Sequence, residues 1–595
     1  MNRPNSRPLK VYAFDPSQRR NLGNLMTLPV RYEVLKPGPI GGRIAVIDYD
    51  TTNECYYPPV DLDASEILIA NGLDPSEADP HFHQQMVYAI ASETIRYFER
   101  ALGRDAKWGF RSRRGPLANR LRILPHAIQD ANAYYSRELG GLVFGYFRAS
   151  EDDPGDNLPG QTIFTCLSHD IVAHETTHAL VDGLRMYFME DTGRDVAAFH
   201  EAFADIVALF EHFAVSEALV DTIQRTGGQL HIIALQPEAP VVDGHPLILS
   251  QLGGTNPLVE LAKQFGEAIG QRKALRSALG APPEPGALDK LFEPHARGSI
   301  LVAAVFDAFF SVYLKRTRDL LRIGRANGSA LGPGEVHPDL ANRLAGEAAK
   351  LAVHFVNMCV RALDYCPPVD ITFGEFLRAL VTADSDLVPA DDWGYRDALI
   401  QAFRLRGIRP EGVVSFAEDS LRWSGPPGNR ELRCEGLEFD VIHGTKAEQL
   451  ARNARLLSRF GTSHARALGL QSSVPVQAHS FHPVHRVGPD GRLKFEIVAE
   501  LLQRRRGVPV DPKNRDSATF TFRGGATLVL EDDGTIRYAV HKWLDDKKRL
   551  ERQRAHYDHL DVVSPLTVFE VPLGGGPRLR DITRRVDFCA VHRGM

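Results

Sequence analysis

The chain has 595 residues, of which 43% are hydrophobic and 24% are charged, and its formal net charge is −5. That length exceeds the size of one ordinary hydrophobic core, so two or more domains are expected. The charge balance lacks the basic excess of a nucleic-acid-binding protein, and no stretch approaches the roughly 18 apolar residues of a membrane span. The first residues, MNRPNSRPLKVYAFD, lack the apolar segment of a signal peptide. We therefore expect a cytoplasmic location, with neither a nucleic acid nor a membrane as partner.

Residues 1–160 are expected to form a β-rich N-terminal lobe with one long helix. The helix is predicted at residues 81–102, because Asp79 precedes a proline at a typical helix start and Gly103 is a typical C-cap. Before it, short apolar runs separated by Pro and Gly predict strands and turns. After it, a Gly-Gly pair at position 140 lies between two apolar runs and predicts a hairpin.

Residues 161–408 are expected to form a helical lobe. Three stretches are long, periodic and apolar on one broad face, which predicts helices at residues 162–186, 196–214 and 297–324. The composition of residues 325–337 predicts a loop, after which helices resume up to about residue 407.

Residues 411–595 are expected to form a separate accessory domain rich in β-structure. The segments FEIVAELL and ATLVLEDDGTIRYAVHKW predict strands, and the Asp-Gly pair in the second segment predicts a hairpin turn. No motif in this part predicts its role. The whole chain is therefore assigned to the α+β class.

The sequence AHETTHAL carries the pattern HExxH inside the helix predicted at 162–186. His174 and His178 are four residues apart, so both imidazoles project from one helix face and can reach one metal ion. Glu175 lies beside them and can approach a water bound to that ion. Because HExxH also arises by chance in a chain with 22 histidines, the surrounding sequence has to support this assignment.

The support comes from the next predicted helix, DVAAFHEAFADIVALFEHF, where Glu201 and Asp205 share one face among apolar residues. A carboxylate buried without a partner is strongly unfavourable. We therefore predict that Glu201 is the third metal ligand and that Asp205 accepts a hydrogen bond from a ligating histidine.

Two histidines and one glutamate leave a fourth zinc position open for water, which is typical of catalytic zinc sites. Imidazole ligands favour zinc over magnesium or calcium, so one zinc ion is the expected cofactor. Zinc lowers the pKa of its bound water towards about 7, and Glu175 is expected to take that proton as the water attacks a peptide carbonyl. The same residue would later pass the proton to the leaving amine.

These motifs resemble the thermolysin-like neutral metallopeptidases, in which an HExxH helix is followed by a Glu-x-x-x-Asp helix. The likeness covers roughly residues 80–408 as separate blocks in the family's order, including DITFGEFLRALVTADSDL. It implies a two-lobed zincin with a β-rich N-terminal lobe, a helical C-terminal lobe and the active-site helix between them. It also implies a peptide or protein as substrate.

Two further segments carry the resemblance and imply roles for individual residues. The segment DANAYYSRELGGLVFGYF is similar to the family's edge strand, which implies that Asn132 and the backbone of Ala133 hold an extended substrate. The segment EPHARGSILVAAVFDAF is similar to the family's histidine-bearing helix start. This implies that His295 stabilises the oxyanion of the tetrahedral intermediate, with Asp289 as the carboxylate that orients it.

Two other residues are nominated by the resemblance alone. The segment ALRSAL is similar to the one whose arginine binds the substrate carbonyl, which nominates Arg276. Tyr187 is nominated as a second oxyanion donor. The alternatives are a surface arginine in the first case and a packed core tyrosine in the second.

The chain also departs from the family's pattern. No signal peptide or propeptide precedes HETTH, so control by propeptide cleavage is not expected. Asp170 matches a calcium ligand of the family, but His212 replaces the glutamate expected on the second helix. A calcium site is therefore expected to be absent or weakened. His200 replaces an asparagine of the family and is either an additional hydrogen-bond donor or a competing ligand.

The main hypothesis is a zinc-dependent endopeptidase, and two alternatives stay open. One is a zinc exopeptidase built on the same HExxH and Glu geometry, which an acidic cluster for the substrate α-amine would favour. The other is a non-catalytic binding or regulatory protein on a metallopeptidase fold, against which the intact Glu175 argues. The sequence does not predict an oligomeric state.

Overall fold

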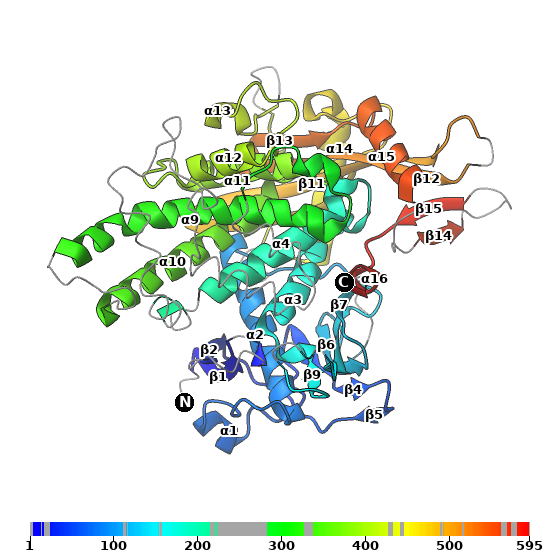
Figure 1. The fold of residues 1–595 in the computed structure, drawn as a ribbon. Coiled ribbons are helices and arrows are strands. Elements are labelled where there is room, and N and C mark those ends of the chain that lie inside the picture. Colours follow the sequence, from blue (N-terminus) through cyan, green and yellow to red (C-terminus); the bar gives the residue numbers. More distant parts are fainter. Residues whose placement is uncertain are drawn as a thin grey trace.

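The computed structural model describes residues 4–13, 15–16, 24–110, 115, 117–152, 154, 157–214, 219–220, 223, 282–326, 337–426, 432–440, 445–487, 491, 493–514, 517–560, 568–572 and 580–593. Within these residues the chain combines helices and strands, in agreement with the predicted α+β class (Figure 1). Most of the loop predicted at 325–337 lies outside the described residues.

The N-terminal part contains small sheets around one long helix. Its largest sheet has five strands in the order β3-β6-β8-β7, with β9 on β8: β3 (Ile44–Val46), β6 (Leu121–Ile128), β7 (Ala133–Ser136), β8 (Gly141–Arg148) and β9 (Thr162–Phe164). Smaller elements complete this part: β1 (Ser6–Tyr12) with β2 (Leu25–Arg31), β4 (Tyr49–Asp50) with β5 (Cys55–Tyr56), and α1 (Ser65–Ile69). Strand β7 lies at the sheet edge and pairs antiparallel with β8, which confirms the predicted hairpin.

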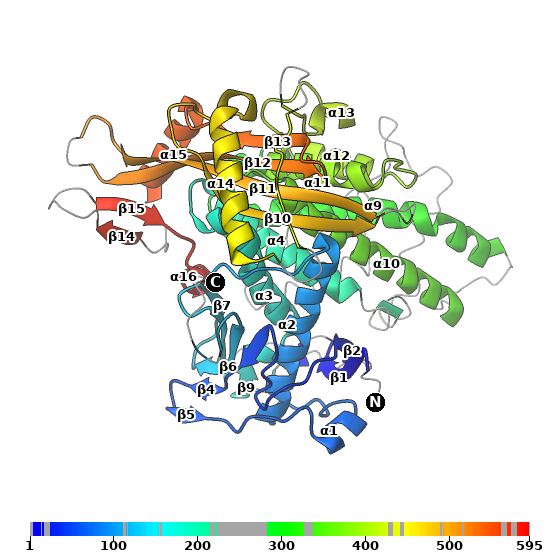
Figure 2. The ribbon, with the colours of Figure 1, turned by 180° about the vertical axis from the view of Figure 1, so that it is seen from behind.

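The long helix predicted at residues 81–102 is α2 (Pro80–Leu102). The Asp79 carboxylate accepts a hydrogen bond of 3.0 Å from the backbone N–H of His81, and Gly103 ends the helix in the left-handed conformation at φ 66°. Most of α2 is buried, because it packs on N-terminal strands and on helices of the central core (Figure 2). Its predicted caps and bounds are thus confirmed.

The central core is helical in the residues that the structure describes. It consists of α3 (His169–Leu184), α4 (Arg194–Phe213), α8 (Ala287–Lys290), α9 (Pro294–Ala326), α10 (Pro338–Ala362), α11 (Phe373–Leu387) and α12 (Tyr395–Leu405), with the short helices η2 (Thr165–Leu167), η3 (Met186–Met189) and η6 (Leu363–Tyr365). Helix α4 is buried along almost its whole length and contributes a row of phenylalanines to the core, among them Phe199, Phe203 and Phe210.

The helix predicted at residues 162–186 is shorter than its periodicity indicates. Residues 162–164 form strand β9 on β8, and η2 follows, so α3 begins only at His169. Pairing with a neighbouring strand here overrides the helical pattern, a tertiary effect that local periodicity does not contain. The metal-ligand motif lies well inside α3 and is unaffected.

One described helical segment, Pro294–Leu320 of α9, is long and apolar enough to cross a membrane by length and composition. In the structure it packs on α4, α10 and α12, and 83% of its most apolar window is buried. Core helices of soluble proteins pass the same test when other helices surround them.

The C-terminal part contains a six-stranded sheet in the order β10-β11-β12-β15-β14, with β13 paired to β12. Its elements are α13 (Glu418–Leu421), α14 (Ala447–Ser463), η7 (Ala465–Leu468), β10 (Gln477–Val487), β11 (Leu493–Pro509), β12 (Thr519–Glu531), β13 (Ile536–Lys542), α15 (Lys547–Leu560), β14 (Val568–Pro572), β15 (Arg580–Arg584) and α16 (Phe588–Arg593). The predicted hairpin at the Asp-Gly turn is the antiparallel pair of β12 and β13, with Gly534 at φ 85°.

The two faces of strand β11 contact different parts of the molecule. Its residues Ile497, Ala499 and Leu501 face α14 and form a hydrophobic cluster with Leu457 of that helix. The alternate residues include two buried glutamates that face the helical core, because successive side chains of a strand point to opposite faces. The face of β11 that is turned to the helical core therefore carries charged side chains that pair with charged groups.

Buried ion pairs connect the sheet to the helical core. The closest are Arg185 with Glu500 and Glu190 with Arg523, each at 2.7 Å. Within the core, Asp364 of η6 pairs with Arg104 at 2.7 Å. Asp364 also accepts a hydrogen bond of 3.1 Å from Arg486 of β10. Burial alone would raise the pKa of Asp364, but the guanidinium of Arg104 and the neighbouring His482 imidazole hold it well below its usual range.

Replacing Asp364 by Asn is expected to lower the free energy of unfolding by about 3–5 kcal/mol, because two guanidinium groups would lose their buried counter-charge. Urea denaturation of the two proteins measures this difference. The exposed Asp392 provides the matched control, and Asp392→Asn is expected to change stability by less than about 0.5 kcal/mol. Equal losses in the two variants would contradict a stabilising role of the buried pairs.

Candidate metal centre

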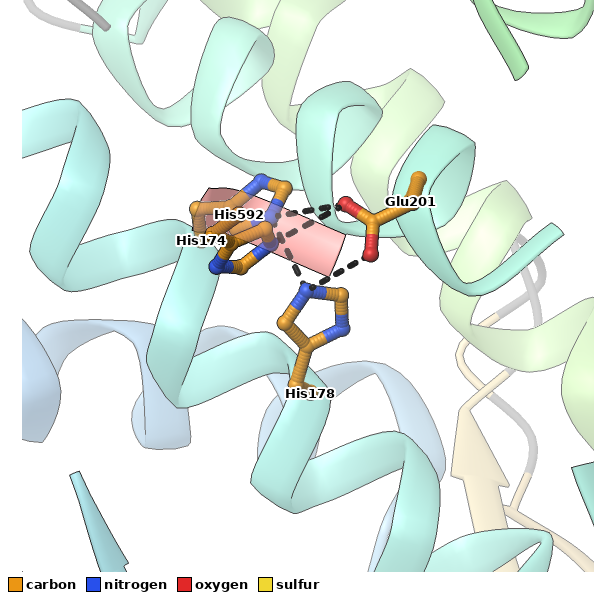
Figure 3. Close-up of side chains that lie close together, drawn as sticks. All are labelled: His174, His178, Glu201 and His592. Atoms are coloured by element: carbon orange, nitrogen blue, oxygen red, sulfur yellow. Dashed lines mark hydrogen bonds and ion pairs between the residues drawn. The ribbon is translucent and has the colours of Figure 1, made fainter. Parts of the chain in front are cut away.

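Two packed helices bring the predicted metal ligands together. His174 and His178 lie one turn apart on α3, and their Nε2 atoms are 2.9 Å from each other. Glu201 lies on the facing helix α4, with Oε2 at 3.3 Å from Nε2 of His174 and Oε1 at 3.7 Å from Nε2 of His178. Figure 3 shows the two imidazoles and the carboxylate converging on one point.

A fourth residue, His592 of α16, joins this group, and sequence reasoning did not find it. The four residues each offer a ligand atom, and these atoms all lie within 4.8 Å of one another. Figure 3 shows the His592 ring beside that of His174, directed at Glu201. A single histidine near the end of the sequence carries no spacing signal, so nothing in the local pattern indicates this contact.

The donor set fits a zinc ion. Both carboxylate oxygens of Glu201 are buried and have no hydrogen-bond partner among the described residues. Buried carboxylates are normally hydrogen-bonded, paired or bound to a metal. Imidazole nitrogens with one carboxylate are typical zinc ligands, whereas calcium and magnesium prefer oxygen-rich sites. His174, His178 and Glu201 are therefore the residues that would hold the ion.

The outer nitrogens of both ligand histidines have partners that orient the rings. Asp205, one turn after Glu201 on α4, lies with Oδ1 at 3.0 Å from Nδ1 of His174, in the position predicted for it. Nδ1 of His178 lies 3.2 Å from Nδ1 of His200. His200 thus contacts the outer side of a ligand ring, which agrees with the first of the two roles predicted for it.

Electrostatics favour the protonation states that a metal site needs. Burial lowers the pKa of His178 well below its usual value, so its imidazole is neutral and keeps a lone pair for a metal. Burial alone would raise the pKa of Glu201, but the surrounding imidazoles, above all that of His295, hold it well below its usual range. The site therefore combines a neutral His178 ring with an ionised Glu201 carboxylate.

Glu175 lies between the metal ligands and strand β7. Its Oε2 accepts a hydrogen bond of 2.9 Å from the backbone N–H of Tyr135. Its Oε1 is 4.0 Å from Nε2 of His174 and 3.5 Å from Nδ1 of His592. One carboxylate oxygen is thus held by the sheet, while the other faces the ligand group.

His295 lies at the start of α9, with Nε2 at 3.0 Å from Oε2 of Glu201. The carboxylate that orients this ring is Glu293, whose Oε1 is 2.9 Å from Nδ1 of His295. This corrects the prediction of Asp289, which is exposed on the short helix α8. Glu293 also accepts hydrogen bonds from the backbone N–H groups of His295 and Ala296, a favourable position for a carboxylate at a helix start.

Two of the remaining predicted residues lie elsewhere or outside the described chain. The ring of Tyr187, on η3, is 5.0 Å from the ring of His479, and the guanidinium of Arg523 lies 5.0 Å from its centroid. Tyr187 therefore contacts the C-terminal sheet, through His479 of β10 and Arg523 of β12. Arg276 lies outside the described residues.

Asn132 and Ala133 lie at the start of β7, next to the metal centre, and both contact α16. The side-chain amide of Asn132 donates a hydrogen bond of 3.2 Å to the carbonyl of Cys589. The carbonyl of Ala133 lies 2.7 Å from Nδ1 of His592. The edge of the sheet predicted to hold a substrate is thus in contact with the chain's own C-terminal helix.

Two other histidine clusters occur among the described residues. His212 lies with Nδ1 at 3.2 Å from Oδ1 of Asp170, so an imidazole pairs with the carboxylate that matches the family's calcium ligand. His83, His126 and Cys166 form a second buried group. There, the two histidines lie 2.7 Å apart, and His126 lies 2.8 Å from Asp48. Hydrogen bonds within the second group already engage its ring nitrogens.

Comparisons with known proteins add nothing to the assignment of this site, which rests on its residues alone. No protein-family model matches the chain, and no curated protein matches its sequence significantly.

Replacing Asp205 by Asn is expected to weaken zinc affinity by about 10–100-fold, because the amide orients His174 without the carboxylate charge. Competition with a chromophoric chelator measures the affinity of each protein. Asp392→Asn serves as the control and is expected to bind zinc as the wild type does. Unchanged zinc affinity in Asp205→Asn would contradict the role of Asp205 behind His174.

Proposed function

We propose that the chain is a zinc-dependent endopeptidase with a thermolysin-like active site. The observation that carries this proposal is the convergence of His174, His178 and Glu201 with Glu175 buried beside them. The β-rich part before α3 and the helical part after it agree with the two lobes that the resemblance implies. A peptide or protein is the proposed substrate.

A zinc ion held by these ligands would polarise a peptide carbonyl and lower the pKa of a bound water. Glu175 would take the proton of the attacking water at Oε1, because Oε2 is held by the backbone of Tyr135. The same oxygen would then pass the proton to the leaving amine. The fixed Oε2 contact keeps the carboxylate in one orientation through both transfers.

His295 is proposed as the donor that stabilises the oxyanion. Its Nδ1 lies 2.9 Å from the Glu293 carboxylate, which holds the ring in one orientation. Its Nε2 is directed at the metal centre, at 3.0 Å from Glu201. A donor fixed before the reaction stabilises developing negative charge without reorganisation.

Strand β7 is proposed to bind the substrate as an added strand. It forms the edge of the five-stranded sheet and lies directly beside Glu175. The Oδ1 atom of Asn132 is buried and has no hydrogen-bond partner among the described residues, so it can accept from a substrate amide. Main-chain pairing of this kind binds extended peptides with little dependence on sequence.

The alternative of a non-catalytic binding protein is favoured by one observation, namely that α16 contacts the same edge strand and the same metal ligands. Such a protein would bind zinc but would cleave no peptide, with or without α16 in place. Activity of the site therefore decides between the two functions.

Replacing Glu175 by Gln is expected to lower hydrolysis of unfolded casein by about 10²–10⁴-fold, because the amide cannot accept the proton of the water. Zinc content, measured by elemental analysis, should stay at that of the wild type. The exposed Glu435 provides a control, and Glu435→Gln should cleave casein as the wild type does. Cleavage by Glu175→Gln at the wild-type rate would exclude the proposed general base.

A further inference from the structure

Helix α16 reaches the metal centre from the C-terminal sheet. After β15, Arg585 forms a β-bridge with Glu190, and the backbone N–H of Val586 donates a hydrogen bond of 2.9 Å to the carbonyl of Met189. The chain then forms α16, which packs against the edge strand β7 beside α3 (Figure 1). The chain's last helix is thus fixed to the core just before it enters the candidate active site.

Polar groups of α16 engage the edge strand where a substrate would pair. The carbonyl of Cys589 accepts from the Asn132 side chain at 3.2 Å. The imidazole of His592 donates from Nδ1 to the carbonyl of Ala133 at 2.7 Å. These are the two residues proposed to hold an extended substrate, so helix and substrate compete for the same part of the edge strand.

Apolar side chains of α16 cover the metal ligands. The ring of Phe588 stacks on the imidazole of His178, with 3.9 Å between centroids and 21° between planes. Phe588 and Val591 are buried and belong to the main hydrophobic core. Removal of water from this face strengthens the contacts that hold the helix in place.

His592 presents a free lone pair to the metal ligands. Its Nδ1 donates to the carbonyl of Ala133, so in the neutral form of the ring the lone pair lies on Nε2. That Nε2 is buried, has no hydrogen-bond partner among the described residues and lies 3.5 Å from Oε2 of Glu201. A histidine whose outer nitrogen donates to a carbonyl has the usual arrangement of a metal-binding histidine.

We propose that α16 is an intramolecular inhibitor of the active site, in which His592 acts as a fourth metal ligand in place of water and the helix covers the substrate-binding edge of β7. This inference rests on the proposed function. The enzyme is then latent as long as α16 is bound, because a site with four protein ligands is closed like a structural zinc site. Activation requires that the helix leaves or that a peptide substrate displaces it.

The proposal predicts how removal of the imidazole changes ligand binding. When only a fraction of the molecules has an open site, the apparent affinity of a ligand falls by that fraction. If α16 leaves the site open in less than about a tenth of the molecules, opening it raises the apparent affinity for a site-directed ligand at least about tenfold. A peptide hydroxamate, which binds the metal and pairs with an edge strand, is a suitable probe.

The test compares the full-length wild type with His592→Ala and with His81→Ala, whose imidazole is 44% exposed at the start of α2. Titration calorimetry with the hydroxamate measures affinity, and the visible absorption of the cobalt-substituted proteins reports the number and type of metal ligands. We expect His592→Ala to bind the hydroxamate at least about tenfold more tightly and to change the cobalt spectrum. His81→Ala should match the wild type in both measurements.

Three outcomes are decisive. Tighter hydroxamate binding with faster casein hydrolysis in His592→Ala supports both the inhibitory role and the peptidase function. Tighter binding and a changed cobalt spectrum without casein hydrolysis support the inhibitory role but count against the peptidase function. Equal affinities and equal spectra in His592→Ala and the wild type would overturn the inhibitory role, even if both proteins cleave casein.

A second variant covers the case in which His592→Ala fails to fold. Phe588→Ala keeps the imidazole but removes the ring that stacks on His178. It should raise hydroxamate affinity in the same direction, and a synthetic peptide with the sequence of residues 585–593 should reduce that affinity again. If neither Phe588→Ala nor the peptide changes hydroxamate binding, α16 does not block the site.

Discussion

The burial of one carboxylate between two helices is the constraint on which the candidate site depends. Glu201 is ionised inside the contact between α3 and α4, where water cannot solvate it. A charge in such a place persists only with compensating partners, and here imidazoles from three separate elements surround it. The same requirement explains why the described donor set suits a cation and why the histidine rings have fixed orientations.

A similar requirement fixes the C-terminal sheet on the helical core. The alternation of β11 gives one apolar face for α14 and one face with buried glutamates, which need cations from the core. This polar contact also positions the segment that leads into α16. The sheet thus does more than extend the fold, because it holds the chain that contacts the metal ligands.

Sequence reasoning located the elements whose signals are local. The caps of α2, the hairpin of β7 and β8, and the turn before β13 depend on a few neighbouring residues, and each lies where it was predicted. It failed at the start of α3, because residues 162–164 pair with β8 and the helical periodicity does not include that partner. It also nominated Asp289 as the partner of His295, whereas the start of α9 places Glu293 against that ring.

The sequence by itself determined the pairing of His174 with His178, since a spacing of four residues on a helix places both rings on one face. It also determined the shared face of Glu201 and Asp205 for the same reason. Only the tertiary structure decided that Tyr187 contacts the C-terminal sheet, and that His592 approaches Ala133 across a separation of 459 residues. Contacts of that kind depend on the packing of distant elements, and no local period or spacing encodes them.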